Sequence, residues 1–413
     1  MSYDPGSGAI VPATAADARA AVGYLRTPLA IRVRAANVLE AGLLGELRHF
    51  TVARDRIDAV ADRVIAVTRA AYPNLRIPFH GHLAHLRAAG LQPGAVERGD
   101  AGIDALVDLV VVSAILSAAA GDAWRYRDAV TGQELSRTEG LAVATLRAFE
   151  AGLFSADALA PLRADAAALR QLDDDDLARA LQASGANPLV GLAGRAHLLR
   201  RLGEVLDESA ARFPGGRPSG LFHMLRARGP EVRAADLLGE LLEGLGPIWP
   251  GPASLAGVGL GDVWRHPAAG GSGPSAGLVP LHHLSQWLAY SLFEPFEQGG
   301  LRVAQPGALT GLPDHRDGGL LVDLGVIVPR HDGVTRDLHQ VGDEVVVEWR
   351  ALTVALLDWV ADAVREKLEV SAEQLPLARI LEGGTRAAGR QLARERRPGG
   401  GSPIPVDSDG TVF

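Results

Sequence analysis

Apolar side chains that recur every three to four residues constrain the fold of this chain more than any other feature. One such stripe stops before Pro73 and consists of Ile57, Val60, Val64 and Val67, which is typical of an amphipathic helix. Similar patterns predict further helices at residues 103–120, 138–151, 155–185, 188–211, 231–244, 278–298 and 347–368. We therefore expect a mainly α protein.

Helix starts near the N-terminus carry recognisable caps. Thr14 begins a helix that ends near Arg26, and Thr27 precedes Pro28 at the first position of the next helix. The run of four aspartates at 173–176 is interpreted as a solvated helix start, because carboxylates suit the positive end of the helix dipole. A cation site is the alternative.

Two segments favour strands instead. Residues 320–328 and 344–347 are rich in valine and leucine, which predicts a small β element near 310–350. The expected organisation is an N-terminal extension, 1–25, and one large helical domain, 26–413. This domain can consist of two lobes, 26–215 and 216–413.

Composition excludes several kinds of chemistry. The 413 residues include no cysteine, so disulfides, thiolate nucleophiles and zinc–thiolate sites are excluded. Lys367 is the only lysine, which argues against a P-loop lysine or a Schiff base. The net charge of −8 argues against a nucleic-acid-binding protein, because such proteins ordinarily carry a basic surface.

The sequence also argues against targeting to a membrane. Residues 1–12 lack a basic region followed by an apolar run. The most apolar stretch, 103–120, contains Asp104 and Asp108, so it is interpreted as a buried helix. We expect a soluble, cytoplasmic protein that binds neither membrane nor nucleic acid.

A first candidate site lies on the predicted helix that follows Pro280. Its polar and aromatic residues share one face and are His283, Gln286, Trp287, Tyr290 and Glu294. Such a face suits the wall of a pocket for a polar ring or a sugar, with Trp and Tyr stacking and Gln and His hydrogen-bonding. The alternative is a partly buried helix whose polar groups are satisfied internally.

A second candidate is the segment 309–319, in which Asp314, His315, Arg316 and Asp317 are consecutive. A loop before a predicted strand positions a catalytic carboxylate well, and an acid beside arginine stays ionised. An exposed charged turn is the alternative.

Three histidines, His80, His82 and His85, invite a metal interpretation. On a helix only His82 and His85 would converge, and no H-E-x-x-H motif occurs. We therefore favour a hydrogen-bonding or structural role, and expect no metal and no cofactor.

Glycines at 383 and 384 precede a predicted helix start, where backbone N–H groups with Arg386 or Arg390 suit an anion. An ordinary capped turn is the default. The glycine pattern at 257–261 follows no predicted strand, and no G-x-S-x-G occurs. Carboxylate and histidine chemistry around a stacking pocket remains, which fits hydrolysis at a sugar carbon.

Several motifs together resemble the uracil-catabolism protein family, the fourth component of a reductase-independent uracil degradation pathway. They lie at 38–42, 137–144, 187–192, 244–250, 261–264, 284–287, 309–313, 347–353 and 408–413. The family was long a domain of unknown function, and the resemblance implies cleavage of a ribosyl–urea bond.

The Leu-Pro-acid-aromatic-Arg motif at 312–316 is also similar to one in queuosine-salvage nucleotide glycosidases. That more distant resemblance implies a helical core like that of DNA glycosylases. It also implies that Asp314 is the catalytic carboxylate and Arg316 its neighbour.

The chain departs from the family pattern mainly around this predicted pocket. The departures are His315 for tyrosine, Asp317 for asparagine, His283 for lysine, Leu281 for phenylalanine, Arg386 for tryptophan, Ser117 for aspartate, and a missing tryptophan near Leu83. They indicate a divergent member whose substrate is a modified nucleoside, nucleotide or other N-ribosyl compound.

We therefore expect an N-glycosidase for a small, optionally phosphorylated N-ribosyl compound, acting as a monomer or homodimer. Its expected catalytic residues are Asp314, which activates water, Arg316, which orients it or binds phosphate, and Asp262. The expected substrate-binding residues are His283, Gln286, Trp287, Tyr290, Trp264, His315, Asp317, Glu139, Arg386, Arg390 and His80. The alternatives are a non-catalytic nucleotide-binding or assembly protein and, more weakly, a His-based metal hydrolase.

Overall fold

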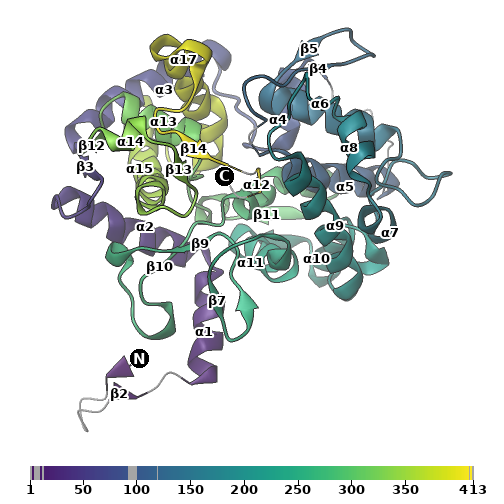
Figure 1. The fold of residues 1–413 in the computed structure, drawn as a ribbon, viewed down its shortest axis with the longest axis horizontal. Helices are drawn as coiled ribbons and strands as arrows, with labels where there is room; N and C mark the ends of the chain where they lie inside the picture. The colour runs from purple at the N-terminus through teal and green to yellow at the C-terminus, as the bar shows by residue number, and fades with distance from the viewer. Residues whose placement is uncertain are drawn as a thin grey trace. The chain divides into compact units, whose positions relative to one another are not determined.

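The computed structural model describes residues 2–3, 10–11, 14–91, 100–118, 120–408 and 410–411. The protein is mainly α, and its strands form only short pairs (Figure 1). The chain divides into two compact units, and neither is one continuous stretch of sequence. Unit 1 comprises Met1–Pro78, Pro250–His283 and Pro306–Asp407, and unit 2 comprises Phe79–Trp249, Leu284–Gln305 and Ser408–Phe413. The lobes expected at 26–215 and 216–413 stay a prediction.

The helices of unit 1 are α1 (Ala15–Leu25), α2 (Pro28–Leu43), α3 (Ile57–Ala71), α13 (His315–Asp323), α14 (Gly333–Arg336), α15 (Glu344–Leu368), α16 (Leu377–Ile380) and α17 (Arg386–Arg396). Its strands are β1 (Ser2–Tyr3), β2 (Ile10–Val11), β3 (Phe50–Val52), β7 (Ser254–Leu255), β8 (Val258–Gly259), β9 (Val263–Arg265), β10 (Leu278–Pro280), β12 (Ile327–Pro329), β13 (His339–Gln340) and β14 (Val406–Asp407).

Helix α15 is the centre of unit 1. It packs against α2, α3 and α13, and α13 in turn packs against α17 (Figure 1). Every residue of α15 from Val345 to Leu357 is buried, and most of these residues are apolar. A helix buried on all sides must be surrounded by other elements, and α2, α3 and α13 are three that pack against it.

The helices of unit 2 are α4 (His82–Ala88), α5 (Asp100–Leu116), α6 (Arg137–Glu150), α7 (Ala166–Arg170), α8 (Asp174–Ala180), α9 (Leu192–Glu208), α10 (Gly220–Arg228), α11 (Ala234–Gly244) and, from its second residue, α12 (His283–Gln298). Its strands are β4 (Tyr126–Arg127), β5 (Glu134–Leu135), β6 (Glu231–Arg233) and β11 (Arg302–Ala304). Helix α5 packs against α4, α6 and α9.

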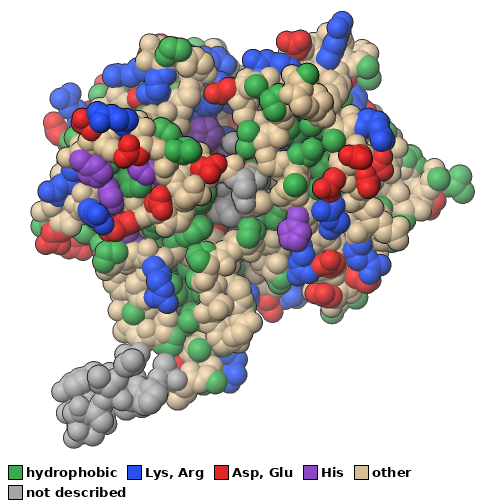
Figure 2. Space-filling view, viewed as in Figure 1, with side chains coloured by type: hydrophobic (Ala, Val, Ile, Leu, Met, Phe, Trp, Pro, Cys, Tyr) green, Lys and Arg blue, Asp and Glu red, His purple; other side chains and the backbone are tan. Residues whose placement is uncertain are grey.

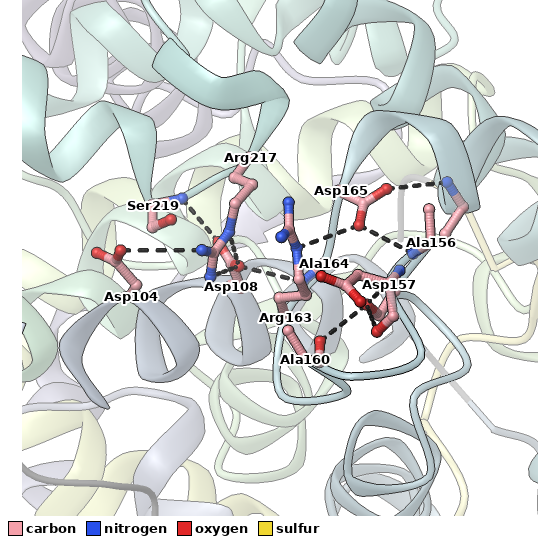
Figure 3. A network of polar contacts seen from close by, with 12 residues as sticks. Asp104, Asp108, Ala156, Asp157, Ala160, Arg163, Ala164, Asp165, Arg217 and Ser219 are labelled. Atoms are coloured by element: carbon pink, nitrogen blue, oxygen red, sulfur yellow. Dashed lines mark hydrogen bonds and ion pairs between the residues drawn. The ribbon is translucent and has the colours of Figure 1, made fainter. Parts of the chain in front are cut away.

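A buried carboxylate joins three segments of unit 2 (Figure 3). Asp108, fully buried on α5, accepts a hydrogen bond from Arg217 Nη2 at 2.7 Å and from the backbone N–H groups of Ser219 and Ala164 at 2.8 and 3.1 Å. Nearby, Asp165 caps α7 and accepts a bond from the N–H of Ala156. These oxygens are saturated by structural donors, so we interpret the network as structural.

Most helix predictions are confirmed. The Thr14 and Thr27 side chains both cap helices, and Asp173 caps α8 with the three following aspartates in its first turn. The aspartate run is therefore a helix start, as predicted.

The predicted helix over 155–185 is wrong. Only α7 and α8 form there, because Ser155, Asp165 and Asp173 hydrogen-bond to backbone groups that a continuous helix would pair.

The two predicted strands are also wrong in large part. The end of α13 covers 320–323, and only Ile327–Pro329 is extended, pairing antiparallel with β3. Residues 344–347 form the first turn of α15. A short, uniformly apolar run is compatible with both a buried helix and a buried strand. Residues 344–347 are helical because they belong to α15, which is buried on almost all sides.

Positive and negative side chains are interspersed on the face shown in Figure 2. In the described part of the chain, no helix combines the length and the apolar character that crossing a bilayer requires.

Candidate functional site

The candidate site begins at the first turn of α13 in unit 1. Asp314 precedes this helix as its N-cap, and its Oδ1 accepts hydrogen bonds from the N–H groups of Arg316 and Asp317 at 2.7 and 3.0 Å. Aspartate is among the best residues for this position. The cap fixes the carboxylate, which is 4% exposed, and leaves Oδ2 directed to a different partner.

That partner comes from the segment after α16. Residues 381–385 form a π-helical turn that runs without a break into α17. Gly383 and Gly384 let the turn press against α3, since a Cβ on Gly384 would lie 2.5 Å from Thr68 Oγ1. Beyond the turn, Arg386 places Nε 3.0 Å from Asp314 Oδ2. The predicted helix start with free N–H groups at this point is therefore wrong, because the backbone stays helical through it.

Arg386 determines the charge of Asp314. Burial alone would raise the pKa of this carboxyl, but the adjacent guanidinium, with help from the capping N–H groups, holds the pKa well below its usual range. Asp314 is thus a carboxylate at every ordinary pH.

Asp317 is the opposite case, one helical turn away. Burial, and next the charge of Asp314, raise its pKa well above the usual range, which favours the neutral carboxylic acid. Within the described part of the chain, both of its oxygens and the Thr385 hydroxyl are buried without a hydrogen bond of standard geometry. Thr385 lies close enough to influence the pKa of Asp317. Asp317 and Thr385 therefore lie together in the buried interior of unit 1.

Two histidines accompany the carboxyl groups. Burial lowers the pKa of His283 to about 4 and that of His315 to about 3, although Asp314 attracts the protonated form of both. Both rings are therefore neutral near pH 7, so each has one N–H donor and one acceptor nitrogen.

Asp262 is held in a fixed position by its neighbours. Arg350 Nη1 and Nη2 donate to its two oxygens at 2.8 Å each, and Trp264 Nε1 and the N–H of His283 donate as well. Burial would raise the pKa of Asp262, but Arg350 lowers it to about 2. The donors around Asp262 indicate that it orients the chain at His283.

Arg316 and Arg390 complete the predicted set in unit 1. Arg316 Nη1 donates to the carbonyl of Gly400 at 2.8 Å, so its guanidinium ties α13 to the turn that follows α17. Arg390 lies on α17, one turn after Arg386, and is half-buried.

The other predicted residues belong to unit 2. Gln286, Trp287 and Tyr290 are buried on α12. The rings of His80 and His85 lie 4.8 and 5.4 Å from that of Trp287, centroid to centroid. Glu139 lies in the first turn of α6, and Glu294 forms an ion pair with Arg87. The stacking pocket expected here stays a prediction.

Three residues that the sequence analysis did not select also converge. His49, Glu344 and Glu348 bring potential metal-ligand atoms within 4.8 Å of one another, and they are the only such group among the described residues. The i, i+4 spacing of the glutamates was the available signal, but the predicted strand at 344–347 concealed it.

Comparison with known proteins gives one family over nearly the whole chain. Residues 24–413 match the family described as "Protein of unknown function (DUF1688)". The chain is 37% identical over 401 residues to "Protein urg3" of Schizosaccharomyces pombe, covering 93% of this chain and 96% of that protein. It is 33% identical over 411 residues to "Uracil catabolism protein 4" of Lachancea kluyveri, covering 89% and 93%.

Proposed function

The chain belongs to the DUF1688 family, and from this premise we propose that it acts in uracil catabolism as a hydrolase of N-glycosidic bonds. The substrate is a small N-ribosyl compound. One relative carries uracil catabolism in its name, which supports the pathway. The chemistry is supported by the two carboxyl groups of α13.

The observation that carries the proposal is the contrast between Asp314 and Asp317. Two buried carboxyl groups, one with a lowered and one with a raised pKa, lie within one helical turn. Pairs of titratable groups whose environments push their pKa values apart are the usual arrangement of a base and an acid in catalysis. N-glycoside hydrolysis requires both functions, because water must lose a proton and the leaving nitrogen must gain one.

In the proposed reaction the bond between the leaving nitrogen and the anomeric carbon breaks, and a water oxygen bonds to that carbon. Asp314 stabilises the positive charge that develops on the sugar and accepts the proton of the attacking water. Asp317 donates its proton to the leaving nitrogen. Proton exchange with water then restores both groups. Neutral His283 and His315 offer hydrogen bonds to the substrate without adding charge.

The remaining residues have supporting roles in this proposal. Asp262 and Arg350 orient the chain at His283, and Arg386 keeps Asp314 ionised. Arg390, beside Arg386 on α17, is the candidate to bind a substrate phosphate. Trp264, which is also in unit 1, is the candidate for binding the rest of the substrate. The binding roles predicted for the unit 2 residues Glu139, Gln286, Trp287, Tyr290 and His80 stay predictions.

Replacement of each carboxyl group tests the proposal. A panel of N-ribosyl compounds, ribosylurea among them, is incubated with the full chain, and free ribose or ribose phosphate is measured. We expect Asp314→Asn and Asp317→Asn to lower kcat by about 10²–10⁴-fold, the range for loss of general acid–base catalysis. For the unmodified protein, kcat/KM should fall as the pH rises through the pKa of Asp317.

Asp362→Asn is the matched control, since Asp362 is an exposed aspartate on α15 in the same unit. It should retain full activity. Turnover that survives in the Asp314 variant contradicts the assignment of this residue. Substrate binding without release of sugar from any compound favours a non-catalytic binding protein instead.

A further inference from the structure

A second cluster of polar side chains lies in unit 1, outside the Asp314 site. His49, Glu344 and Glu348 come from two distant parts of the chain, and one ligand atom from each falls within 4.8 Å of the others. We propose that these three side chains bind a divalent transition-metal ion of the Zn²⁺ type.

The fold brings these residues together by two short-range constraints. His49 directly precedes β3, and His331 follows β12. Because β3 and β12 pair, the two histidines lie side by side, with His49 Nδ1 3.0 Å from His331 Nε2. Glu344 and Glu348 are one turn apart at the start of α15 and therefore share a face. Figure 2 shows histidine side chains beside acidic ones over this part of unit 1.

Glu348 is the strongest single indication of a cation. It is fully buried, and among the described residues its only partner at ion-pair distance is His266, with Nε2 3.4 Å from Oε1. Arginine or lysine ordinarily accompanies a carboxylate at such depth. A metal ion would supply the missing positive charge.

The hydrogen bonds to Glu348 fix its orientation and leave a position open. The N–H groups of Arg48 and His49 donate to Oε1 and Oε2 at 3.2 and 3.1 Å. His266 Nδ1 accepts from the N–H of Ala268, so its Nε2 carries the proton that faces Glu348. A carboxylate has about four acceptor positions, and these three donors leave one. Supporting hydrogen bonds of this kind orient the ligands of metal sites.

Small movements would complete the coordination. Tetrahedral zinc holds ligand atoms at about 2.0–2.2 Å from the metal, which places neighbouring ligand atoms about 3.4 Å apart. Glu344 and His49 are half-buried, and the Arg48 guanidinium that pairs with Glu344 at 3.7 Å is largely exposed. Arg48 can therefore turn into solvent as the metal binds. One imidazole and two carboxylates leave a fourth position for water, or for His331 after rotation.

The test is titration of metal-free protein with Zn²⁺ alone, measured by calorimetry, and with Co²⁺, measured by its visible absorption. We expect one equivalent to bind saturably, with a Co²⁺ spectrum typical of four or five ligands. Glu344→Gln and His49→Gln should each weaken binding at least 10-fold. Glu366→Gln, an exposed glutamate near the other end of α15, is the control and should bind as the unmodified protein does.

Unchanged stoichiometry and affinity in both His49→Gln and Glu344→Gln would overturn the proposal, because the metal would then bind elsewhere. The absence of saturable binding up to 1 mM Zn²⁺, which corresponds to a binding free energy of about −4 kcal/mol, would overturn it as well. Circular dichroism of each metal-free variant separates loss of ligands from loss of fold. If one variant is unfolded, the other decides, because the two residues belong to different elements.

Discussion

Single residues in this protein acquire their chemistry from immediate neighbours. Asp314 and Asp317 are the same amino acid one helical turn apart, yet the pKa of Asp314 is lowered and that of Asp317 is raised. The difference comes from Arg386, which lies against Asp314, and from burial together with the charge of Asp314, which raise the pKa of Asp317. As a consequence, Asp317 lowers the free energy of unfolding at any pH at which its carboxyl group is ionised in the unfolded chain.

At the residue scale we predict that Asp317→Asn stabilises the protein at alkaline pH while it lowers activity. A carboxyl with a raised native pKa contributes stability below its unfolded pKa, and this contribution is lost as the pH rises through the native pKa. Each pH unit by which the native pKa exceeds the unfolded pKa corresponds to about 1.4 kcal/mol of stability. The melting temperature of Asp317→Asn should exceed that of the unmodified protein by several degrees at pH 8, and the gap should close toward pH 4. A variant that is less stable at every pH would contradict a neutral Asp317.

At the scale of elements, the site depends on the close approach of α13, α17 and the π-helical turn. Such turns are rare and often occur at functional sites, and here the turn places Thr385 and Arg386 beside the two aspartates. Glycine makes the approach feasible. A Cβ on Gly389 of α17 would overlap the carbonyl of Arg316 on α13, so these helices touch backbone to backbone.

We therefore predict that Gly389→Ala separates α13 from α17. Its expected cost is about 1–3 kcal/mol in the free energy of unfolding, as for other overpacked sites. Because Arg386 would withdraw from Asp314, kcat should fall as well. Denaturant unfolding and turnover measure the two effects.

Gly239→Ala is the control for this prediction. Gly239 lies inside α11 with open space around its Cα, so alanine should stabilise the helix by about 0.5–1 kcal/mol. If Gly389→Ala behaved like Gly239→Ala, the backbone contact would not be a constraint.

At the scale of the whole molecule, histidines whose pKa is lowered by burial or partial burial are found in both units. Burial lowers the pKa of His82 in unit 2 to about 3, and it lowers the pKa of His282, His283 and His315 in unit 1. Neither ring nitrogen of His82 has a hydrogen-bond partner among the described residues. In the unfolded chain each of these histidines becomes protonated as the pH falls through about 6.5. In the native protein its pKa is lower, so protonation requires a lower pH.

We predict that the free energy of unfolding falls as the pH drops below 6.5. A histidine with a depressed native pKa contributes stability above its unfolded pKa, and this is lost as the pH falls toward the native pKa. Each of the four contributes up to about 1.4 kcal/mol per pH unit. Denaturant unfolding between pH 7 and 5 measures the slope, and His82→Asn should make it shallower. A stability that is constant over this range would contradict the prediction.

Local sequence patterns were enough to predict the mainly α fold and the capped starts of α1, α2 and α8, and they directed attention to the segment that contains Asp314. These features are local, because caps and apolar stripes depend on residues within a turn or two. The helical state of residues 344–347 depends on tertiary packing, since the buried surroundings of α15 come from distant segments. The same holds for the contrast between Asp314 and Asp317, which depends on Arg386 about seventy residues later, and for the convergence of His49 with Glu344 and Glu348. Charge states and ligand clusters depend on burial and on neighbours far apart in sequence, and no pattern along one chain encodes these directly.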